Sequence, residues 1–420
     1  MTVILDRPYE FIPPYRGGGW PSVIQMLRLT DRHLRKQESV IDYELRHADR
    51  LAASVAAGHG VLLAPNHCRY ADPIVLGWLS REVGAHLYAM ASWHLFNKNA
   101  FESFALRRMG AFSIYREGND RQAIETAIGI LATAARPLVL FPEGTTNRTN
   151  DLLKPLLEGV SFIARTAAKK RDRAGQGEVV MHPVAIKYLC LGDAWVWADE
   201  QLRRIEITLS WQEQPVNTDP DALLQRLMRV SEAYLALKEI EHIGKASAGD
   251  LRPRRDALIE FLLQRCEQRY QLTPTNGDDI RERVRKIRAA IATAFFLPSQ
   301  NGPRDPTTYA FDAETADLAQ FLLSFPDEYL TPGKITDTRI VETIQRIQEA
   351  IHGKAKETMP MKVIIEVDEA IPVPPTRAPR GETDPLLCQL DSRLRTMLRS
   401  LSTEARDFER PDSNRQTAAT

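Results

Sequence analysis

Short apolar runs alternate with amphipathic stretches along residues 58–245. The run "VLLAP" at 61–65 is continuously apolar and bounded by turn residues, which is typical of a strand buried on both faces. Further strands are expected at 85–91, 111–116, 137–141, 179–189 and 203–216, and helices at 73–82, 119–135 and 156–170. This alternation predicts an α/β domain over 58–245, with a layered mixed sheet flanked by helices.

Helical patterns precede and follow this domain. Residues 21–57 carry apolar positions among charges and are expected to form helix, so that 1–57 is an N-terminal helical segment. Residues 246–360 are predicted to be a helical region of unknown role, with helices at 251–271, 278–296, 312–324 and 335–352. Residues 361–420 are expected to hold a strand, a helix at 384–401 and a disordered tail.

The composition excludes several classes of protein. Acidic and basic residues number 55 each, so no overall field attracts nucleic acid, and no nucleic-acid partner is expected. The cysteines form no CxxC pair, so neither a disulfide framework nor a metal site is expected, and we expect no cofactor. The N-terminus lacks the basic and apolar parts of a signal peptide, and no window is long and apolar enough to span a bilayer. A cytoplasmic protein that meets a membrane only from its surface is expected.

The stretch "APNHCRYAD" at 64–72 places His67 just after the buried strand and Asp72 five residues further on. One interpretation is an ordinary helix start, with Asp72 as the N-cap and Pro73 at the first helical position. The other is a catalytic base with an orienting carboxylate, because a partner on one ring nitrogen leaves the other free to accept a proton. The position at the carboxyl end of a strand favours the second, since α/β sheets carry their sites there.

Three weaker patterns follow along the chain. In "PLVLFPEGTTNRT" (137–149) a turn is expected to lift Glu143 and the backbone N–H groups of Gly144 and Thr145 to the end of a strand, although a plain strand-to-loop turn is equally common. "GAFSIYR" (110–116) puts Arg116 at a strand outlet, where a lone arginine is usually solvated. "MHPVAIKY" (181–188) has a proline inside a strand, which suggests an edge strand or a bulge.

Taken in order, "NHCRYAD", "GAFSIYR", "FPEGTT" and "HPVAI" resemble the four motif blocks of the glycerolipid acyltransferase family, of the 1-acylglycerol-3-phosphate acyltransferase type with its phospholipid/glycerol acyltransferase domain. The resemblance spans about 60–215, and its first and third blocks are the specific ones. It implies an α/β enzyme of lipid biosynthesis. The implied reaction moves a fatty acyl group from acyl-CoA or acyl-carrier protein to a hydroxyl of a lysophospholipid or glycerol phosphate.

The resemblance also implies roles for individual residues. His67 would be the catalytic base and Asp72 its orienting partner. Many relatives carry an arginine where this chain has Thr146, and the nearest arginine here is Arg148, so the resemblance leaves phosphate recognition and the identity of the acceptor open. The remaining implied positions are acceptor-binding Arg116, Glu143, Gly144, Thr145 and Arg148, and Pro183 on the acyl-donor side.

The chemistry is coherent without the family. Acyl transfer from a thioester requires a base and donors for the tetrahedral oxyanion, but no metal, and no nucleophilic side chain if the acceptor attacks directly. Cys68 invites a covalent interpretation, but adjacent side chains of an extended segment point apart. Two alternatives stay open: a lipid- or acyl-carrier-binding module without catalysis, and a thioester or lipid hydrolase that uses the same residues.

Contact with a membrane surface is expected from aromatic residues with basic neighbours at 92–110, or these aromatics pack in the core instead. Basic runs at 169–173 and 281–288 could add attraction to anionic lipid, or be solvated faces. The expected location is therefore peripheral, at the inner face of the membrane. The residues concerned at 92–110 are Trp93, Phe96, Lys98, Phe101, Phe104, Arg107 and Arg108.

Overall fold

The chain divides into two compact units that each combine separate stretches of sequence. The first comprises Met1–Lys187, Arg288–Ala310 and Val363–Ser402, and the second Tyr188–Ile287, Phe311–Lys362 and Thr403–Thr420. The domains predicted from the sequence are continuous segments, whereas each compact unit is assembled from separate stretches, so the two divisions of the chain do not coincide. The computed structural model describes residues 7–118, 120–211, 220–275, 278–297, 305–326, 329–331, 335–353, 355, 358–376 and 384–409.

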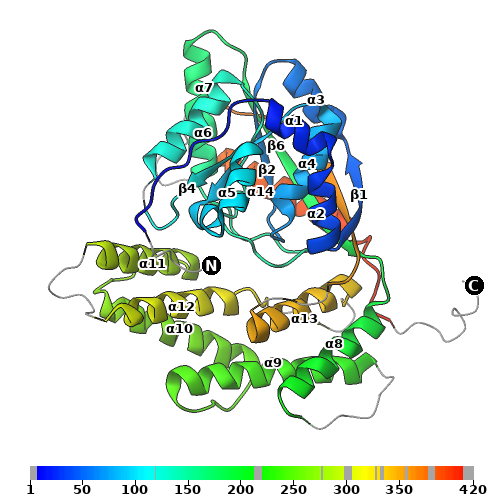
Figure 1. Ribbon diagram of the computed structural model, residues 1–420, viewed down its shortest axis with the longest axis vertical. Helices are drawn as coiled ribbons and strands as arrows, with labels where there is room; N and C mark the ends of the chain where they lie inside the picture. The colour runs from blue at the N-terminus through cyan, green and yellow to red at the C-terminus, as the bar shows by residue number, and fades with distance from the viewer. Residues whose placement is uncertain are drawn as a thin grey trace, which may run out of the picture. The chain divides into compact units, whose positions relative to one another are not determined.

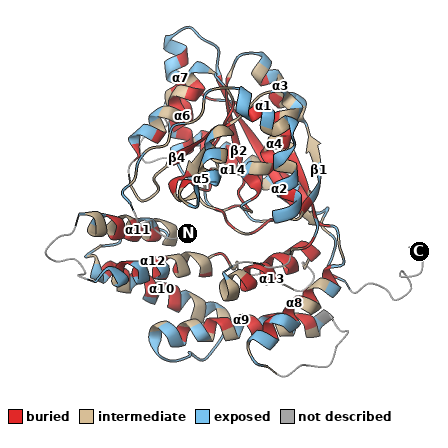
Figure 2. Ribbon diagram, viewed as in Figure 1, coloured by how far each residue is buried: buried red, intermediate tan, exposed pale blue. Residues whose placement is uncertain are grey.

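Eight strands of the described chain form one mixed sheet with helices on its faces (Figure 1). Strand β2 is parallel to both of its neighbours, with Leu62 beside Leu138 on one side and Met181 on the other. Every residue of β2 is buried, which explains its continuous apolar run, and Figure 2 shows the buried strands between the helices. The predicted α/β fold is confirmed. The order is β1 (Val40–Arg46), β7 (Met361–Val367), β6 (Val179–Cys190), β2 (Gly60–Pro65), β5 (Leu138–Val139), β3 (Tyr88–Ser92) and β4 (Ala111–Ile114), with β8 (Ile371–Pro372) antiparallel to β6.

Amphipathic helices cover the sheet. In α6, the buried residues Ala123, Ala127, Ile128 and Leu131 recur at helical spacing and form one apolar stripe. Asp120 begins this helix by accepting a hydrogen bond from the Ala123 N–H at 3.0 Å. The helices of the first unit are α1 (Gly19–Met26), α2 (Leu29–Gln37), α3 (Ala48–Ala56), α4 (Asp72–Val83), the 3₁₀ turn η1 (Trp93–Asn97), α5 (Ala100–Arg108), α6 (Arg121–Thr133), α7 (Gly159–Arg173) and α14 (Pro385–Ser402).

The second unit is mainly helical. Its apolar core joins α8 (Ala194–Thr208), α9 (Pro220–Ile243) and α13 (Asp337–His352), and α9 packs on α10 (Leu251–Arg269). The helices α11 (Ile280–Phe296) and α12 (Pro306–Leu322) are shared between the two units. The helices predicted within 246–360 are thereby confirmed. Among the described helices, none has both the length and the apolar character that crossing a bilayer requires.

The predicted helix over 21–57 is wrong in its middle, where the edge strand β1 lies. Ser39 and His47 bracket this strand with φ angles of 55° and 57°. Because left-handed backbone interrupts a right-handed helix, the segment breaks into α1, α2, β1 and α3. The short β-prone run "VIDY" is the only local sign of the strand.

The predicted strand at 203–216 is also wrong where the structure describes it, because residues 203–208 end helix α8. Trp195, Ala198, Leu202 and Ile205 are buried at spacings of three and four residues, so the apolar face is helical. The alternation in "IEIT" fits a strand equally well over so short a length. Residues 212–219 lie outside the described residues.

Pro183 does not mark an edge strand. Strand β6 lies inside the sheet, and Pro183 is in register with Ala64 of β2. Its carbonyl accepts a hydrogen bond from the Asp368 N–H at 2.9 Å, so the proline uses the one backbone hydrogen-bonding group that it has.

Candidate active site

The loops after β2 and β5 meet because these strands are parallel neighbours. Residues that follow the carboxyl ends of adjacent parallel strands lie at the same edge of a sheet. His67 follows β2, while Glu143 and Thr146 lie in the loop after β5. The register of the two strands therefore brings together residues that are more than 70 positions apart in the sequence.

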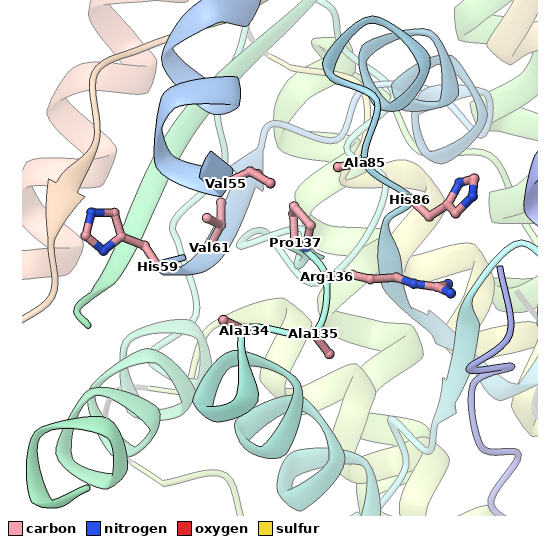
Figure 3. A pocket seen from close by; sticks show the side chains of 9 residues that line it. All are labelled: Val55, His59, Val61, Ala85, His86, Ala134, Ala135, Arg136 and Pro137. Carbon is pink, nitrogen blue, oxygen red and sulfur yellow. The ribbon is translucent and has the colours of Figure 1, made fainter. Parts of the chain in front are cut away.

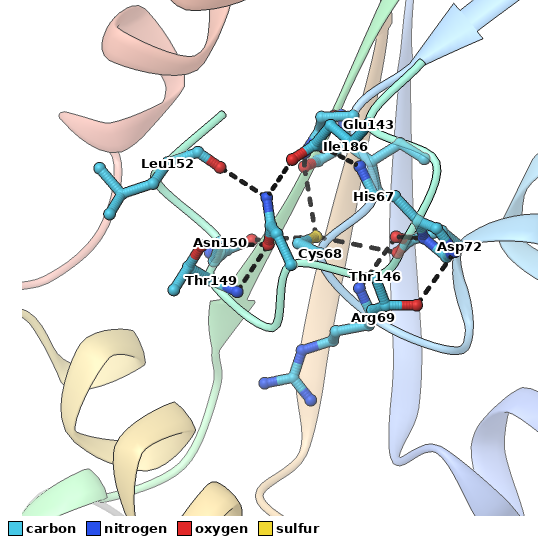
Figure 4. A network of polar contacts seen from close by, with 12 residues as sticks. His67, Cys68, Arg69, Asp72, Glu143, Thr146, Thr149, Asn150, Leu152 and Ile186 are labelled. Carbon is cyan, nitrogen blue, oxygen red and sulfur yellow. Dashed lines mark hydrogen bonds and ion pairs between the residues drawn. The ribbon is translucent and has the colours of Figure 1, made fainter. Parts of the chain in front are cut away.

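His67 has all four of its polar groups engaged (Figure 4). On its ring, Nδ1 is 2.8 Å from Asp72 Oδ2 and Nε2 is 3.1 Å from Thr146 Oγ1. Its backbone N–H donates to Glu143 Oε1 at 2.7 Å, and its carbonyl accepts from the Asn147 N–H at 2.7 Å. His67 is therefore held by hydrogen bonds at both ring nitrogens and at both of its backbone polar groups.

Asp72 fixes the state of the imidazole. The Asp72 side chain is fully buried, and Oδ2 also accepts from the Arg69 N–H at 2.9 Å. Because an ionised carboxylate only accepts hydrogen bonds, Nδ1 of His67 carries the hydrogen and Nε2 presents its lone pair. The predicted N-cap role is wrong: Asp72 is the first residue of α4, Ala71 is the cap, and no side chain caps this helix. The carboxylate is turned to His67 instead.

Glu143 lies behind His67 with its carboxylate fully used. Besides the His67 N–H, it accepts from Asn147 Nδ2 at 2.8 Å and from the Lys154 N–H at 2.9 Å, both on Oε2. Burial raises the pKa of Glu143 to about 7, while these three donors favour its charged form. The sequence led us to expect Glu143 at the acceptor, and this stays a prediction; the contacts that the structure shows tie His67 to the loop after β5.

Two buried amide side chains, which the sequence interpretation missed, fix the same region. Asn147 donates to Glu143 and also to the Leu152 carbonyl at 2.7 Å. Asn66 donates to the Ile186 carbonyl at 3.0 Å and accepts from the Ile186 N–H at 2.7 Å, which continues the ladder between β2 and β6 beyond the strand end. The available signal was their position, one directly before His67 and the other just after the Phe-Pro-Glu-Gly-Thr stretch.

The turn after β5 offers hydrogen-bond donors next to His67. Gly144 has a φ of 71° and gives its N–H to the Phe141 carbonyl at 3.0 Å, and a Cβ there would collide with Leu157. Within the described chain, the N–H groups of Thr145 and Thr146 donate to no other residue, and the buried Thr145 Oγ1 has no hydrogen-bond partner. The Gly144 N–H is therefore used within the turn, whereas those of Thr145 and Thr146 are bonded to no described residue.

Several cations lie around the loop after His67. Arg148, at a strained φ of 64°, places its guanidinium carbon 4.6 Å from the centre of the Tyr70 ring. Burial raises the pKa of Glu38, and the positive charges of His33, Arg69 and Arg148 lower it, so Arg69 and Arg148 lie near one carboxylate. The sequence interpretation missed Arg69.

Arg116 follows β4, one residue beyond Tyr115 at the outlet of the strand. Burial lowers the pKa of Arg116 to about 10, so the guanidinium remains charged at neutral pH. Tyr70 is close enough to interact with it electrostatically. Arg116 therefore lies on the side of the sheet where the loop after His67 runs.

A cavity of about 230 Å³ lies at the other end of the strands (Figure 3). It opens at the amino ends of β2, β3 and β5, whereas His67 follows the carboxyl end of β2. Within the described residues, no group of three or more histidine, cysteine or acidic side chains could hold a metal ion. The cavity is lined by Val55, His59, Val61, Ala85, His86, Ala134, Ala135, Arg136 and Pro137.

Comparison with protein families identifies one domain. Residues 43–187 match the family model described as Acyltransferase, a stretch that covers about a third of the chain and includes His67, Asp72, Glu143 and Thr146. A comparison with curated proteins gave no match. The family match supports the glycerolipid acyltransferase family and acyltransferase activity in general terms.

Proposed function

We propose that this protein moves a fatty acyl group from acyl-CoA or acyl-carrier protein to a hydroxyl of a lysophospholipid or glycerol phosphate. The observation that carries this proposal is the hydrogen-bonded chain that runs from the Asp72 carboxylate through the His67 ring to the hydroxyl of Thr146. An imidazole held in this way is set to accept a proton from an alcohol. Together with the acyltransferase match over 43–187, this supports transfer to a hydroxyl acceptor.

The base is assigned to His67 and its orientation to Asp72 and Glu143. As the acceptor hydroxyl attacks the acyl carbonyl, its proton moves to Nε2, and the positive charge that forms on the ring is stabilised by the buried Asp72 carboxylate. The negative charge that develops on the carbonyl oxygen requires donors, which the N–H groups of Thr145 and Thr146 would provide. A donor of this kind is typically worth about 3 kcal/mol in the transition state.

An anionic acceptor is supported by the cations near the base. Arg69 and Arg148 lie around the loop after His67, and Arg116 follows β4. Arginine can bind a phosphate group through two parallel hydrogen bonds, so these side chains suit the phosphate of glycerol phosphate or of a lysophospholipid headgroup. Arg148 and Arg116 would thereby take over the role of the arginine that Thr146 replaces. Pro183, on the neighbouring strand β6, is assigned to the acyl-donor side by resemblance alone.

A membrane surface is the proposed source of the lipid acceptor, at the inner face of the membrane. The aromatic residues of the 92–110 segment fall into two groups. Trp93 and Phe96 are buried, whereas Phe101 and Phe104 are exposed, and the Phe101 side chain is 78% accessible to solvent. Trp20 of α1 contacts Phe104 edge to face at 5.2 Å. Exposed aromatics of this kind suit a headgroup interface.

Basic side chains contribute to this surface unequally. The Arg108 guanidinium lies 5.0 Å from the centre of the Phe104 ring, beside the exposed aromatics. In the basic runs, Arg171 donates to three backbone carbonyls and Arg283 pairs with Glu260 and Glu267, so these two cations serve the fold. We therefore assign the membrane surface to α1 and α5 rather than to the basic runs.

The test is a product screen with the purified protein. It combines a panel of lysophospholipids and glycerol phosphate with acyl-CoA and acyl-carrier-protein donors, and products are read by mass spectrometry. The proposal predicts an acylated acceptor that disappears in His67→Ala. Free fatty acid as the sole product would indicate a hydrolase, and no turnover with any pair would favour a binding module.

A further inference from the structure

Basic side chains precede three neighbouring strands at the edge of the sheet opposite His67. His59 lies directly before β2, His86 lies two residues before β3, and Arg136 lies two residues before β5. Because β5 pairs in parallel with both β2 and β3, the amino ends of these strands lie at one edge. The three side chains are therefore gathered around the cavity of about 230 Å³ (Figure 3).

Arg136 is held in position and has a hydrogen-bond donor that the protein does not use. Its Nη2 donates to the Arg16 carbonyl at 2.9 Å, and its guanidinium carbon lies 4.8 Å from the centre of the Tyr88 ring. Its Nη1 is buried and has no hydrogen-bond partner among the described residues. Because a buried charged donor without an acceptor is costly, this arrangement favours an anion beside Nη1.

His86 supplies a second polar side chain next to Arg136. Figure 3 shows the two side chains on the same side of the cavity, with His59 on the opposite side. Burial and the positive charge of Arg136 lower the pKa of His86, so the two groups interact electrostatically. His86 Nε2 lies 3.0 Å from Ser22 Oγ, which fixes the imidazole. The buried Nδ1 of His59 has no hydrogen-bond partner within the part of the chain that the structure describes.

The lining of the cavity suits an anionic group. None of the nine described residues that line it is acidic, and apart from His59, His86 and Arg136 they are valine, alanine and proline. A guanidinium fork matches a phosphate group, whose oxygens can accept hydrogen bonds from more than one donor. The cavity is several times larger than the roughly 30 Å³ that a water molecule occupies, so a phosphate group has room there.

We propose that this cavity is a binding site for a phosphate group, which Arg136 and His86 hold. The site is separate from the proposed catalytic residues and does not depend on acyl transfer. The carbonyl of Arg16 and the hydroxyl of Ser22, which contact the two side chains, belong to α1 and the segment before it. The same helix carries Trp20, part of the surface assigned to the membrane. The phosphate group therefore comes from a lipid headgroup at that surface or from a phosphate compound in solution.

Methyl NMR locates the binding of inorganic phosphate. The full chain, labelled at its valine and leucine methyl groups, is titrated with inorganic phosphate at constant ionic strength. The proposal predicts saturable shifts of the signals of Val55 and Val61, which line the cavity. Leu157, which lies against Gly144 in the loop after β5, reports separately on binding at the proposed active site. Absence of saturable shifts at Val55 and Val61, with or without a shift at Leu157, would overturn the inference.

Two variants and a matched control test the residues of the cavity. Arg136→Gln should weaken phosphate binding by about 10–100-fold, because a hydrogen bond from a charged group is lost. Ala85→Leu keeps both basic side chains but fills part of the cavity, and it should also weaken binding, whatever the stability of the glutamine variant. Arg121→Gln removes an exposed arginine at the start of α6 and should leave the Kd unchanged. A Kd within threefold of wild type in either cavity variant, once folded, would refute the assignment.

Vesicles distinguish the two sources of the phosphate group. Co-sedimentation with phosphatidylcholine vesicles, with and without phosphatidic acid, is compared for wild type, Arg136→Gln and Arg121→Gln. Weaker binding of Arg136→Gln alone, and only to vesicles that contain phosphatidic acid, would identify a lipid headgroup as the ligand. Equal binding of all three proteins, together with the saturable shifts above, would identify a phosphate compound in solution. None of these measurements involves acyl transfer, so the proposed function and this inference can fail independently.

Discussion

Replacing Glu143 with glutamine tests which force sets the charge of this buried carboxyl group. Burial raises the pKa of Glu143 from its ordinary value of 4.5 to about 7. Between these values the folded protein holds a proton that the unfolded chain has released, so the stabilisation is present at low pH and is lost as the pH rises through about 7. At 1.36 kcal/mol for each pKa unit, the contribution of Glu143 should fall by roughly 2–3 kcal/mol between about pH 5 and about pH 8.

Glutamine removes this dependence because it does not titrate. Its single amide oxygen also serves fewer of the donors from His67, Asn147 and Lys154, which should cost about 1–3 kcal/mol at every pH. The loss of titration and the loss of hydrogen-bond acceptors can be separated, because only the contribution from titration varies with pH.

The assay is urea unfolding followed by tryptophan fluorescence, for wild type and Glu143→Gln across this pH range. The free energy of unfolding of wild type minus that of the variant should fall with rising pH. The surface substitution Glu125→Gln, in an exposed pair with Arg121, controls for the loss of a carboxylate. A difference that rises with pH would mean that the three donors outweigh burial and would refute the reasoning. A constant difference would refute it as well.

Three further substitutions probe the site. His67→Ala should lower the transfer rate by about 10²–10⁴-fold with little change in melting temperature, because a general base typically contributes that much; activity within threefold of wild type would remove the assignment. Asp72→Asn should also lower the rate while leaving the affinity for the donor unchanged, because an amide can donate to Nδ1 and favour the wrong tautomer; unchanged turnover would contradict this. Arg116→Lys should raise the KM for the lysolipid several-fold and leave that of the acyl donor unchanged, since lysine cannot reproduce the bidentate grip; a shift in the donor constant alone would place Arg116 on the wrong side.

Features that depend on neighbouring residues were predictable from the sequence. The buried run of β2 and the helix after it fix the surroundings of His67, and Asp72 is close enough in sequence to be proposed as its partner. The pattern of apolar residues gave the wrong element where helical and strand periodicity fit a short segment equally well. The short strand β1 was taken for helix, and the end of α8 was taken for a strand.

Contacts set by strand register could not be predicted. The hydroxyl of Thr146 reaches His67 because β5 pairs with β2, and no local pattern encodes this pairing. The same holds for Glu143, whose carboxylate turns inward to the His67 backbone. Strand β7 enters the sheet between β1 and β6 from a stretch more than 170 residues after β6, so its place depends on tertiary packing alone.

The stoichiometry of one reaction tests the central claim most directly. Purified protein is mixed with an acyl thioester and the acceptor found in the product screen, and released thiol, acylated acceptor and free fatty acid are measured together. Transfer to a hydroxyl with His67 as the base predicts one acylated acceptor for each thiol released, and neither product above background in His67→Ala. Thiol release matched by free fatty acid, or equal yields of acylated acceptor from wild type and His67→Ala, would contradict the account.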